Sequence, residues 1–278
     1  MSEITAHHGL LKNIELHVDD TGGPGRPVVL IHGWPLSGES WSEQVPVVAG
    51  AGYRVVTYDR RGFGRSSKPH GGYDYDTFAD DLAKVLEELD LTDATLVGFS
   101  MGGGEVARYL TRHGRDRIRS VVFAAAVTPY LAQTEDNPEG PLTDAAATAQ
   151  ATALRTDPDA FYDDFTREFF SVDGELMVTE QQRLQALALA HEADHHAALK
   201  AQEAFATTDF RDDLEQVDVP ALVLHGDSDA IVPLEGSGAR THLAIAASEL
   251  EVILGAPHGL NVSHADAFNE LLLGFLAR

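Results

Sequence analysis

The sequence predicts an α/β fold built on a mostly parallel sheet. Short, continuously apolar runs alternate with segments of helical periodicity, which is the pattern of strands that helices cover on both faces. Polar residues and glycines follow several of these runs directly, and the carboxyl ends of parallel strands are where such sheets bind ligands. The alternation is interrupted once, between about residues 128 and 211, by helical segments. We therefore expect a mostly parallel sheet flanked by helices, with a helical cap inserted into it.

The expected strands are the apolar runs, and the chain before the first of them is expected to be rich in β-structure. Apolar residues at helical spacing predict helices over residues 77–89 and 267–276. The expected strands cover residues 28–31, 54–58, 94–98, 118–124, 221–225 and 251–254.

The expected cap begins where prolines break the chain. Pro129, Pro138 and Pro141 are followed by alanine-rich helical segments at residues 144–153 and 181–193. A chain of 278 residues is long enough for one α/β core with an insertion. We expect the core to comprise residues 1–127 and 212–278, and the cap to comprise residues 128–211.

Residues 98–102 (GFSMG) provide a candidate nucleophile. They close the apolar run at 94–97 and open the helical stretch at 103–110, so Ser100 lies where a buried strand turns sharply into a helix. Glycines on both sides of the serine remove side chains that would collide in such a turn. The G-x-S-x-G pattern is weak by itself, and the strand before it with the helix after it makes it specific.

A serine nucleophile needs a histidine base and an acid that orients the histidine. Both follow later strands: Asp229 lies just beyond the run at 221–225, and His258 lies just beyond the run at 251–254. Asp227 competes with Asp229 for the role of the acid, and its alternative interpretation is a loop carboxylate that accepts backbone N–H groups. The order serine, aspartate, histidine is that of the α/β-hydrolases.

Two backbone N–H groups are the expected donors to an oxyanion. One belongs to Met101, directly after the nucleophile, and the other to Trp34, in the loop that follows the run at 28–31. Pro35 has no N–H and cannot contribute. We interpret His32 as a residue that shapes this loop through hydrogen bonds.

Five motifs carry a resemblance to known proteins: HGWP at 32–35, DRRGFGRSS at 59–67, GFSMGGGE at 98–105, HGDSDAIVP at 225–233 and His258-Gly259. Together they resemble one branch of a known family, the cofactor-free haloperoxidase (perhydrolase) and arylesterase branch of the α/β-hydrolases. Pro257 departs from this branch, where many members have serine before the histidine.

The resemblance implies an α/β-hydrolase fold and a Ser100–Asp229–His258 triad, with Asp229 rather than Asp227 as the acid. It further implies an esterase that also makes peracids from carboxylic acids and hydrogen peroxide, which then oxidise halide without a metal or cofactor. The expected substrates are a small-molecule ester or short carboxylic acid, together with hydrogen peroxide. A lactamase or carbon–carbon bond hydrolase with the same triad stays open, as does a hydrolase-fold ligand receptor with slow turnover.

Residues 191–195 (HEADH) match a zinc-binding pattern in which two histidines share one helix face. Zinc catalysis also needs a third ligand, and a serine triad already accounts for the chemistry. We interpret these histidines as solvated or helix-end residues and expect no metal site. Arg60, Arg61 and Arg65 are expected to form structural pairs with carboxylates and backbone carbonyls.

Composition excludes several classes of function. The chain has 44 acidic and 20 basic residues, a formal net charge of -24, which repels nucleic acid and anionic membranes. It has no cysteine, which rules out disulfides and thiolate-bound haem or iron–sulfur clusters. No signal-peptide pattern is evident, so we expect a cytoplasmic protein. A homo-oligomer stays open, as does the choice between a halophilic surface and ordinary solubilising charge.

Overall fold

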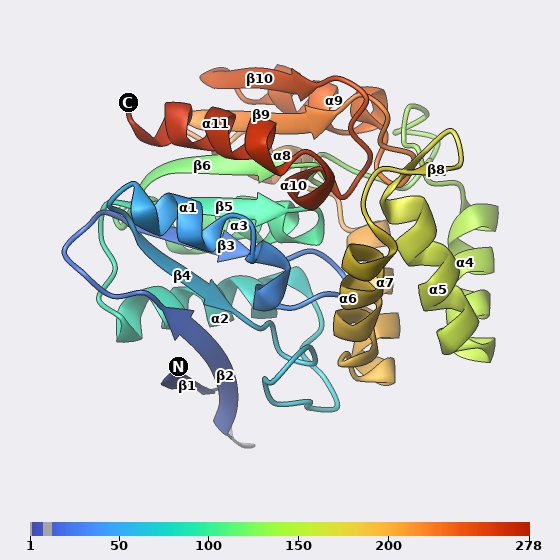
Figure 1. Ribbon diagram of the computed structural model, residues 1–278, viewed down its shortest axis with the longest axis horizontal. Helices are drawn as coiled ribbons and strands as arrows, with labels where there is room; N and C mark the ends of the chain where they lie inside the picture. The colour runs from blue at the N-terminus through green and yellow to red at the C-terminus, as the bar shows by residue number, and fades with distance from the viewer. Residues whose placement is uncertain (1, 8–12) are drawn as a thin grey trace.

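The computed structural model describes residues 2–7 and 13–278, so the start of the expected core at Met1 lies outside the described residues. Its main sheet has eight strands in the described chain, and Figure 1 shows them stacked across the molecule. β1 and β2 pair antiparallel to their neighbours and the other strands pair in parallel. In spatial order the strands are β1 (Ser2–His7), β2 (Asn13–Asp20), β4 (Arg54–Tyr58), β3 (Pro27–Ile31), β5 (Ala94–Phe99), β6 (Ile118–Ala124), β9 (Ala221–Gly226) and β10 (Ser248–Ile253).

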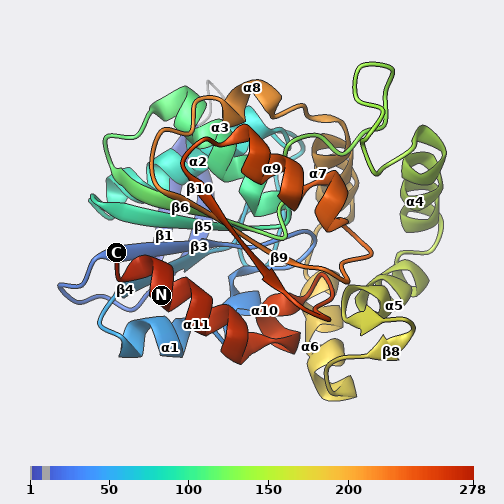
Figure 2. The same ribbon diagram turned by 90° about the horizontal axis from the view of Figure 1, so that it is seen from above.

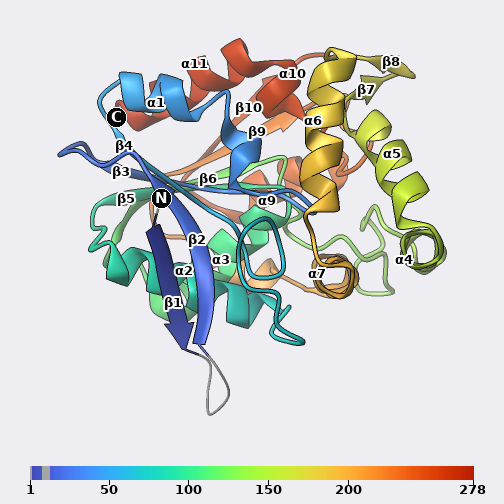
Figure 3. The same ribbon diagram turned by 60° about the horizontal axis from the view of Figure 1, so that its bottom comes forward.

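Helices cover both faces of this sheet, as Figures 2 and 3 show. One face carries α1 (Val45–Gly50), α10 (Leu260–Ser263) and α11 (Ala265–Leu276). The other carries α2 (Tyr75–Glu88), α3 (Met101–His113), α8 (Arg211–Leu214) and α9 (Gly238–Ala244). Short 3₁₀ helices span Gly38–Trp41 and Leu234–Gly236. The expected α/β fold with a mostly parallel sheet is confirmed.

The central strands are continuously apolar because both of their faces are covered, and every residue of β5 and β9 is buried. The last strand differs from its prediction of 251–254. It begins at Ser248 and ends at Ile253, and Leu254 beyond it is 78% exposed. β10 is an edge strand that pairs only with β9 and is half-buried along most of its length, so apolar continuity is a poor guide to its bounds.

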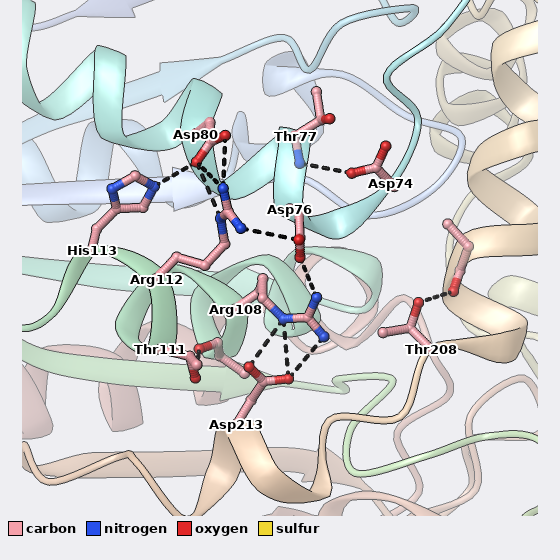
Figure 4. Close-up of polar contacts among 12 residues, drawn as sticks. Asp74, Asp76, Thr77, Asp80, Arg108, Thr111, Arg112, His113, Thr208 and Asp213 are labelled. Carbon is pink, nitrogen blue, oxygen red and sulfur yellow. Dashed lines mark hydrogen bonds and ion pairs between the residues drawn. The ribbon is translucent and has the colours of Figure 1, made fainter.

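Ion pairs fasten α3 to its neighbours on one face of the sheet, as Figure 4 shows. The Arg108 guanidinium donates to Asp213 of α8 at 3.0–3.2 Å and also to Asp76 of α2. One turn later, Arg112 donates to Asp76 at 3.0 Å and to Asp80 at 3.0–3.2 Å. The helix that starts at Ser100 is therefore held on two sides by carboxylates.

A separate group of helices lies between β6 and β9 in the sequence and beyond the carboxyl ends of the strands in space (Figures 1 and 2). The expected helix at 144–153 is confirmed and continues to Thr156. The expected helix at 181–193 ends earlier, at His191, because Asp194 accepts from the Ala197 N–H and caps a new helix. The elements are α4 (Asp144–Thr156), α5 (Pro158–Phe169), β7 (Ser171–Val172), β8 (Glu175–Leu176), α6 (Glu180–His191) and α7 (His195–Thr207).

Across the described ranges, none of the helices combines the length and the apolar character that crossing a bilayer requires.

Candidate active site

Ser100 lies in a tight turn between β5 and α3. Its backbone has φ 54° and ψ −117°, a conformation that non-glycine residues rarely adopt. A Cβ atom on Gly98 would lie 2.4 Å from the carbonyl oxygen of Gly102, and one on Gly102 would lie 2.6 Å from that of Ile31. The glycines on either side of the serine are therefore required by close backbone approach, and the turn presents the hydroxyl at the carboxyl end of β5.

His258 lies between Ser100 and Asp229. Its Nε2 atom is 3.0 Å from the Ser100 Oγ, and its Nδ1 atom is 2.7 Å from the Asp229 Oδ2. The rings of Phe99 and Phe169 flank the imidazole at centroid distances of 5.2 and 5.0 Å. All three polar side chains are buried, so strands far apart in sequence bring them together in a site with little solvent.

The environment of Asp229 keeps its carboxylate ionised. Oδ1 accepts the N–H groups of Ile231 at 2.9 Å and Val232 at 2.8 Å. Burial alone would raise the pKa of Asp229, but the charge of His258 and the hydrogen bonds from His225 and His258 outweigh it and lower the pKa to about 2. The carboxylate is thus fixed and charged beside the histidine.

Asp227, the competing acid, lies in a different part of the same loop. Its Oδ1 accepts the Gly255 N–H at 2.6 Å and the Ser228 hydroxyl at 3.1 Å. The structure therefore brings Asp229 to His258, and Asp227 has the backbone-binding contacts of a loop carboxylate.

The two expected oxyanion donors flank the nucleophile. Within residues 2–7 and 13–278, the backbone N–H groups of Trp34 and Met101 donate to no protein acceptor. Met101 begins α3, where the first N–H groups of a helix lack partners within it. The Trp34 indole is anchored separately, because its Nε1 donates to the Ala198 carbonyl of α7 at 3.0 Å. Neither backbone N–H is therefore engaged within the part of the chain that the structure describes.

His32 shapes the loop that carries Trp34. Its Nδ1 lies 2.8 Å from the Gly33 carbonyl, and its Nε2 accepts the Arg60 N–H at 2.9 Å. Burial, aided by the charge of Arg60, lowers the pKa of His32 to about 3, so the ring is neutral near neutral pH. The Arg60 side chain donates to the His32 carbonyl at 3.0 Å and pairs with Glu105 of α3 at 2.7 Å. This buried ion pair links the loop to the nucleophile helix.

The other two arginines also form the expected structural pairs. Arg61 pairs with Asp81 at 2.6 Å, and Arg65 pairs with Asp59 at 3.0 Å.

Comparisons with known proteins identify the family. The family model described as alpha/beta hydrolase fold matches residues 26–265. The chain belongs to the α/β-hydrolase family. It is 47% identical to a putative non-haem chloroperoxidase of Synechocystis sp., over 95% of each chain, and 34% identical to a bifunctional esterase/perhydrolase of Acinetobacter calcoaceticus, over 95% of this chain and 96% of the relative. Its structure is similar to that of a bromoperoxidase from Bacillus anthracis, with a TM-score of 0.96 and 53% identity over 100% of both chains.

A cavity of about 480 Å³ opens above Ser100 and His258 of this α/β-hydrolase. Its wall is mainly apolar and comes from Trp34, the strand ends and the helices α4, α5 and α7. A larger groove of about 680 Å³ lies elsewhere, beside Phe169 and Phe170, and contains none of Ser100, Asp229 or His258. The smaller cavity is the one next to the reactive groups.

Sequence reasoning missed two polar residues of this site. His225 ends β9, and its Nε2 lies 3.3 Å from the Asp229 Oδ2 and 2.8 Å from the Val232 carbonyl. Gln202 lines the cavity from α7. The sequence did contain a signal for His225, because this residue ends an expected strand and precedes Asp229 by four residues. Gln202 had a weaker one, a polar residue on the otherwise apolar buried side of a helix.

The histidines of the zinc-like pattern do not share a helix. His191 ends α6 and His195 begins α7, so the spacing of four residues does not put them on one helical face. In the part of the chain that the structure describes, no three histidine, aspartate or glutamate side chains are grouped as metal ligands.

Proposed function

We propose that this α/β-hydrolase is a cofactor-independent serine esterase with perhydrolase activity. The observation that carries the proposal is the chain of contacts from Ser100 Oγ to His258 Nε2 at 3.0 Å and from His258 Nδ1 to Asp229 at 2.7 Å, beneath a mainly apolar cavity. A serine, an imidazole and an ionised carboxylate in this order form the arrangement that activates a hydroxyl for acyl transfer.

In the acylation step, the Ser100 Oγ attacks the ester carbonyl carbon while His258 Nε2 takes the hydroxyl proton. Asp229 holds the Nδ1–H tautomer of the imidazole and stabilises the cation that forms. The N–H groups of Trp34 and Met101 bind the tetrahedral oxyanion. When the intermediate collapses, the carbon–oxygen bond to the leaving alcohol breaks and His258 returns the proton to that alcohol, which leaves an acyl group on Ser100.

In the second half-reaction, water or hydrogen peroxide attacks the acyl carbon while His258 again takes a proton. The bond to Ser100 breaks and the proton returns to its oxygen. Water yields the carboxylic acid, and hydrogen peroxide yields the peracid. In solution, a peracid and a proton convert a halide ion into hypohalous acid and the carboxylic acid, so halogenation is a secondary reaction outside the protein.

The names of the relatives support this assignment, since they include non-haem chloroperoxidases and an esterase/perhydrolase. We further assign residues 1–127 and 212–278 to the catalytic core and residues 128–211 to a helical cap. This assignment is supported by the cavity, whose wall includes helices α4, α5 and α7 as well as Ser100 and His258.

The first test compares two activities of the purified protein after treatment with a chelator. We expect hydrolysis of short-chain aryl esters, and bromination that requires acetate and hydrogen peroxide but no added metal. Bromination that requires added vanadate or haem would contradict the proposal, and the absence of ester turnover would favour a ligand receptor. Cleavage of lactams or of carbon–carbon bonds in preference to esters would favour the other enzyme classes.

A Ser100→Ala variant tests the shared intermediate. We expect it to lose both activities together, leaving only the residual catalysis of about 10³–10⁴ over water that an oxyanion hole provides. The test is to measure the rates of ester hydrolysis and of bromination in parallel for the variant and the wild type. Retained bromination with lost ester cleavage would show that the two reactions do not share the acyl-enzyme.

A further inference from the structure

Gln202 is a buried polar residue of the active-site cavity without a polar partner. Its side chain lines the cavity that contains Ser100 and His258, and only 5% of the residue is exposed. The side-chain oxygen Oε1 is fully covered and has no hydrogen-bond partner in the described part of the chain. A buried amide in this position is unusual, because a polar group removed from water without a partner destabilises the fold.

The position of Gln202 ties it to the reacting centre. It lies one helical turn after Ala198, whose carbonyl accepts the indole N–H of Trp34 at 3.0 Å. Trp34 supplies one proposed oxyanion donor, and Phe205, further along α7, is another wall residue whose ring lies 5.8 Å from the Trp34 ring. The face of α7 that carries Gln202 therefore also holds the loop at which the ester carbonyl would bind.

The rest of the cavity restricts what Gln202 can meet. The wall includes the apolar residues Phe161, Phe165 and Leu131, and its other amide, on Gln150, belongs to an exposed residue. The charged lining residues are acidic and exposed, namely Asp157, Asp164 and Glu168. Among the described residues, no lysine or arginine lines the cavity. An ionised carboxylate on a substrate would be repelled by these three groups and would find no cationic partner.

We propose that Gln202 is a substrate-recognition residue, and that the preferred substrates are uncharged esters that carry a hydroxyl group within reach of its amide. The proposal rests on the proposed esterase function and deepens it. A hydroxyl both donates and accepts, so it can pair with whichever end of the amide faces the cavity. Oε1 is covered, and rotation of the terminal amide exchanges it with Nε2. The Gln202 amide contributes least to the binding of a substrate whose chains are purely hydrocarbon. The polar groups of the amide then stay unpaired in the complex.

Matched esters test the proposal on the wild type and on Gln202→Met. One series compares p-nitrophenyl butanoate with analogues that carry a hydroxyl on the second or third carbon of the acyl chain. A second series compares butyl acetate with hydroxybutyl acetates, and so tells whether the hydroxyl belongs to the acyl or the alcohol part. We expect at least one hydroxylated ester to lose about five- to tenfold in kcat/KM relative to its hydrocarbon partner when Gln202 becomes methionine.

The melting temperature gives a second result that does not depend on overall activity. Replacing an unpaired buried amide with an apolar side chain should raise the Tm by about 2–4 °C. Gln202→Leu serves as a second variant if the methionine variant folds poorly. Gln185→Met is the matched control, because Gln185 is an exposed glutamine on α6 outside this cavity. It should change neither the substrate ratio nor the Tm.

The outcomes separate the recognition proposal from the proposed function. If the wild type cleaves the hydrocarbon esters and the ratio is unchanged in Gln202→Met for both series, the role of Gln202 is wrong while the esterase assignment stands. A preference for an acyl chain with a carboxylate over one with a hydroxyl would also overturn it. Absence of turnover on every ester would instead contradict the proposed function.

Discussion

At the scale of single residues, Asp229 and Asp227 show how position within one loop decides chemistry. Both are aspartates of the segment after β9, two residues apart. Asp229 is buried with His258 at 2.7 Å and two backbone N–H groups on its other oxygen, whereas Asp227 binds the Gly255 N–H at the surface. The same carboxyl group contacts an imidazole in one place and a backbone N–H in the other.

Replacing these two acids with asparagine should have unequal effects on catalysis. Asp229→Asn should lower kcat by about 10⁴-fold, the loss expected when an amide stabilises the wrong imidazole tautomer. Asp227→Asn should have a much smaller effect. Because the pKa of Asp229 is lowered to about 2, its carboxylate is ionised at any pH above about 4, so protonation of Asp229 itself should not limit the wild-type rate between about pH 5 and pH 8.

Steady-state kinetics of both variants on one aryl ester provide the measurement. A larger loss in Asp227→Asn would transfer the catalytic role to that residue. Mild losses in both would mean that another acid orients His258.

At the scale of elements, the turn between β5 and α3 depends on close backbone approach. Gly98 has no room for a side chain, since its Cβ would lie 2.4 Å from the Gly102 carbonyl oxygen. Gly274, in α11, is the opposite case, because nothing lies within 4 Å of the position that its Cβ would take. The two glycines therefore serve different purposes, and only the first is required by the fold.

Alanine substitutions at the two glycines should change stability in opposite directions. Gly98→Ala should lower the free energy of unfolding by about 1–3 kcal/mol or more, because the backbone must shift to admit the methyl group. It should also reduce ester turnover, since the shift displaces Ser100. Gly274→Ala should raise the free energy of unfolding by about 0.5–1 kcal/mol, because alanine favours the helix.

Urea denaturation and ester turnover of both variants check this pair. Gly98→Ala with unchanged stability and activity would show that the turn tolerates a side chain. A lower free energy of unfolding for Gly274→Ala would mean that this position in α11 requires glycine.

At the scale of the whole molecule, the main electrostatic feature is the excess of acidic over basic residues. Ion pairs engage many of the basic residues, such as Arg108 and Arg112 with the carboxylates of α2 and α8 (Figure 4). With 44 acidic and 20 basic residues, the acidic residues still outnumber the basic ones by 24. Repulsion among them acts over the whole surface, whereas each exposed ion pair contributes little.

Salt should therefore stabilise the protein near neutral pH. Raising NaCl from about 0.05 M to about 1 M screens the repulsion and should increase the free energy of unfolding by about 1–2 kcal/mol. The control is the same titration near the sequence pI of about 4.7, where the net charge is close to zero and salt should have little effect. A fall in stability with salt at neutral pH would show that the ion pairs outweigh the repulsion and that the acidic surface is ordinary solubilising charge.

The sequence by itself determined the α/β class, most strand positions and the residues of the candidate site. These are local properties: apolar runs mark buried central strands, and the serine, aspartate and histidine each follow such a run. Features that depend on contacts between distant segments were decided only by the tertiary structure. It brought Asp229 rather than Asp227 into contact with His258, ended α6 at His191, and shifted the edge strand β10. It also placed His225 beside Asp229, and Gln202 on the wall of the cavity that contains Ser100. A side chain's partners come from strands and helices far apart in the chain, and no local pattern encodes their distance.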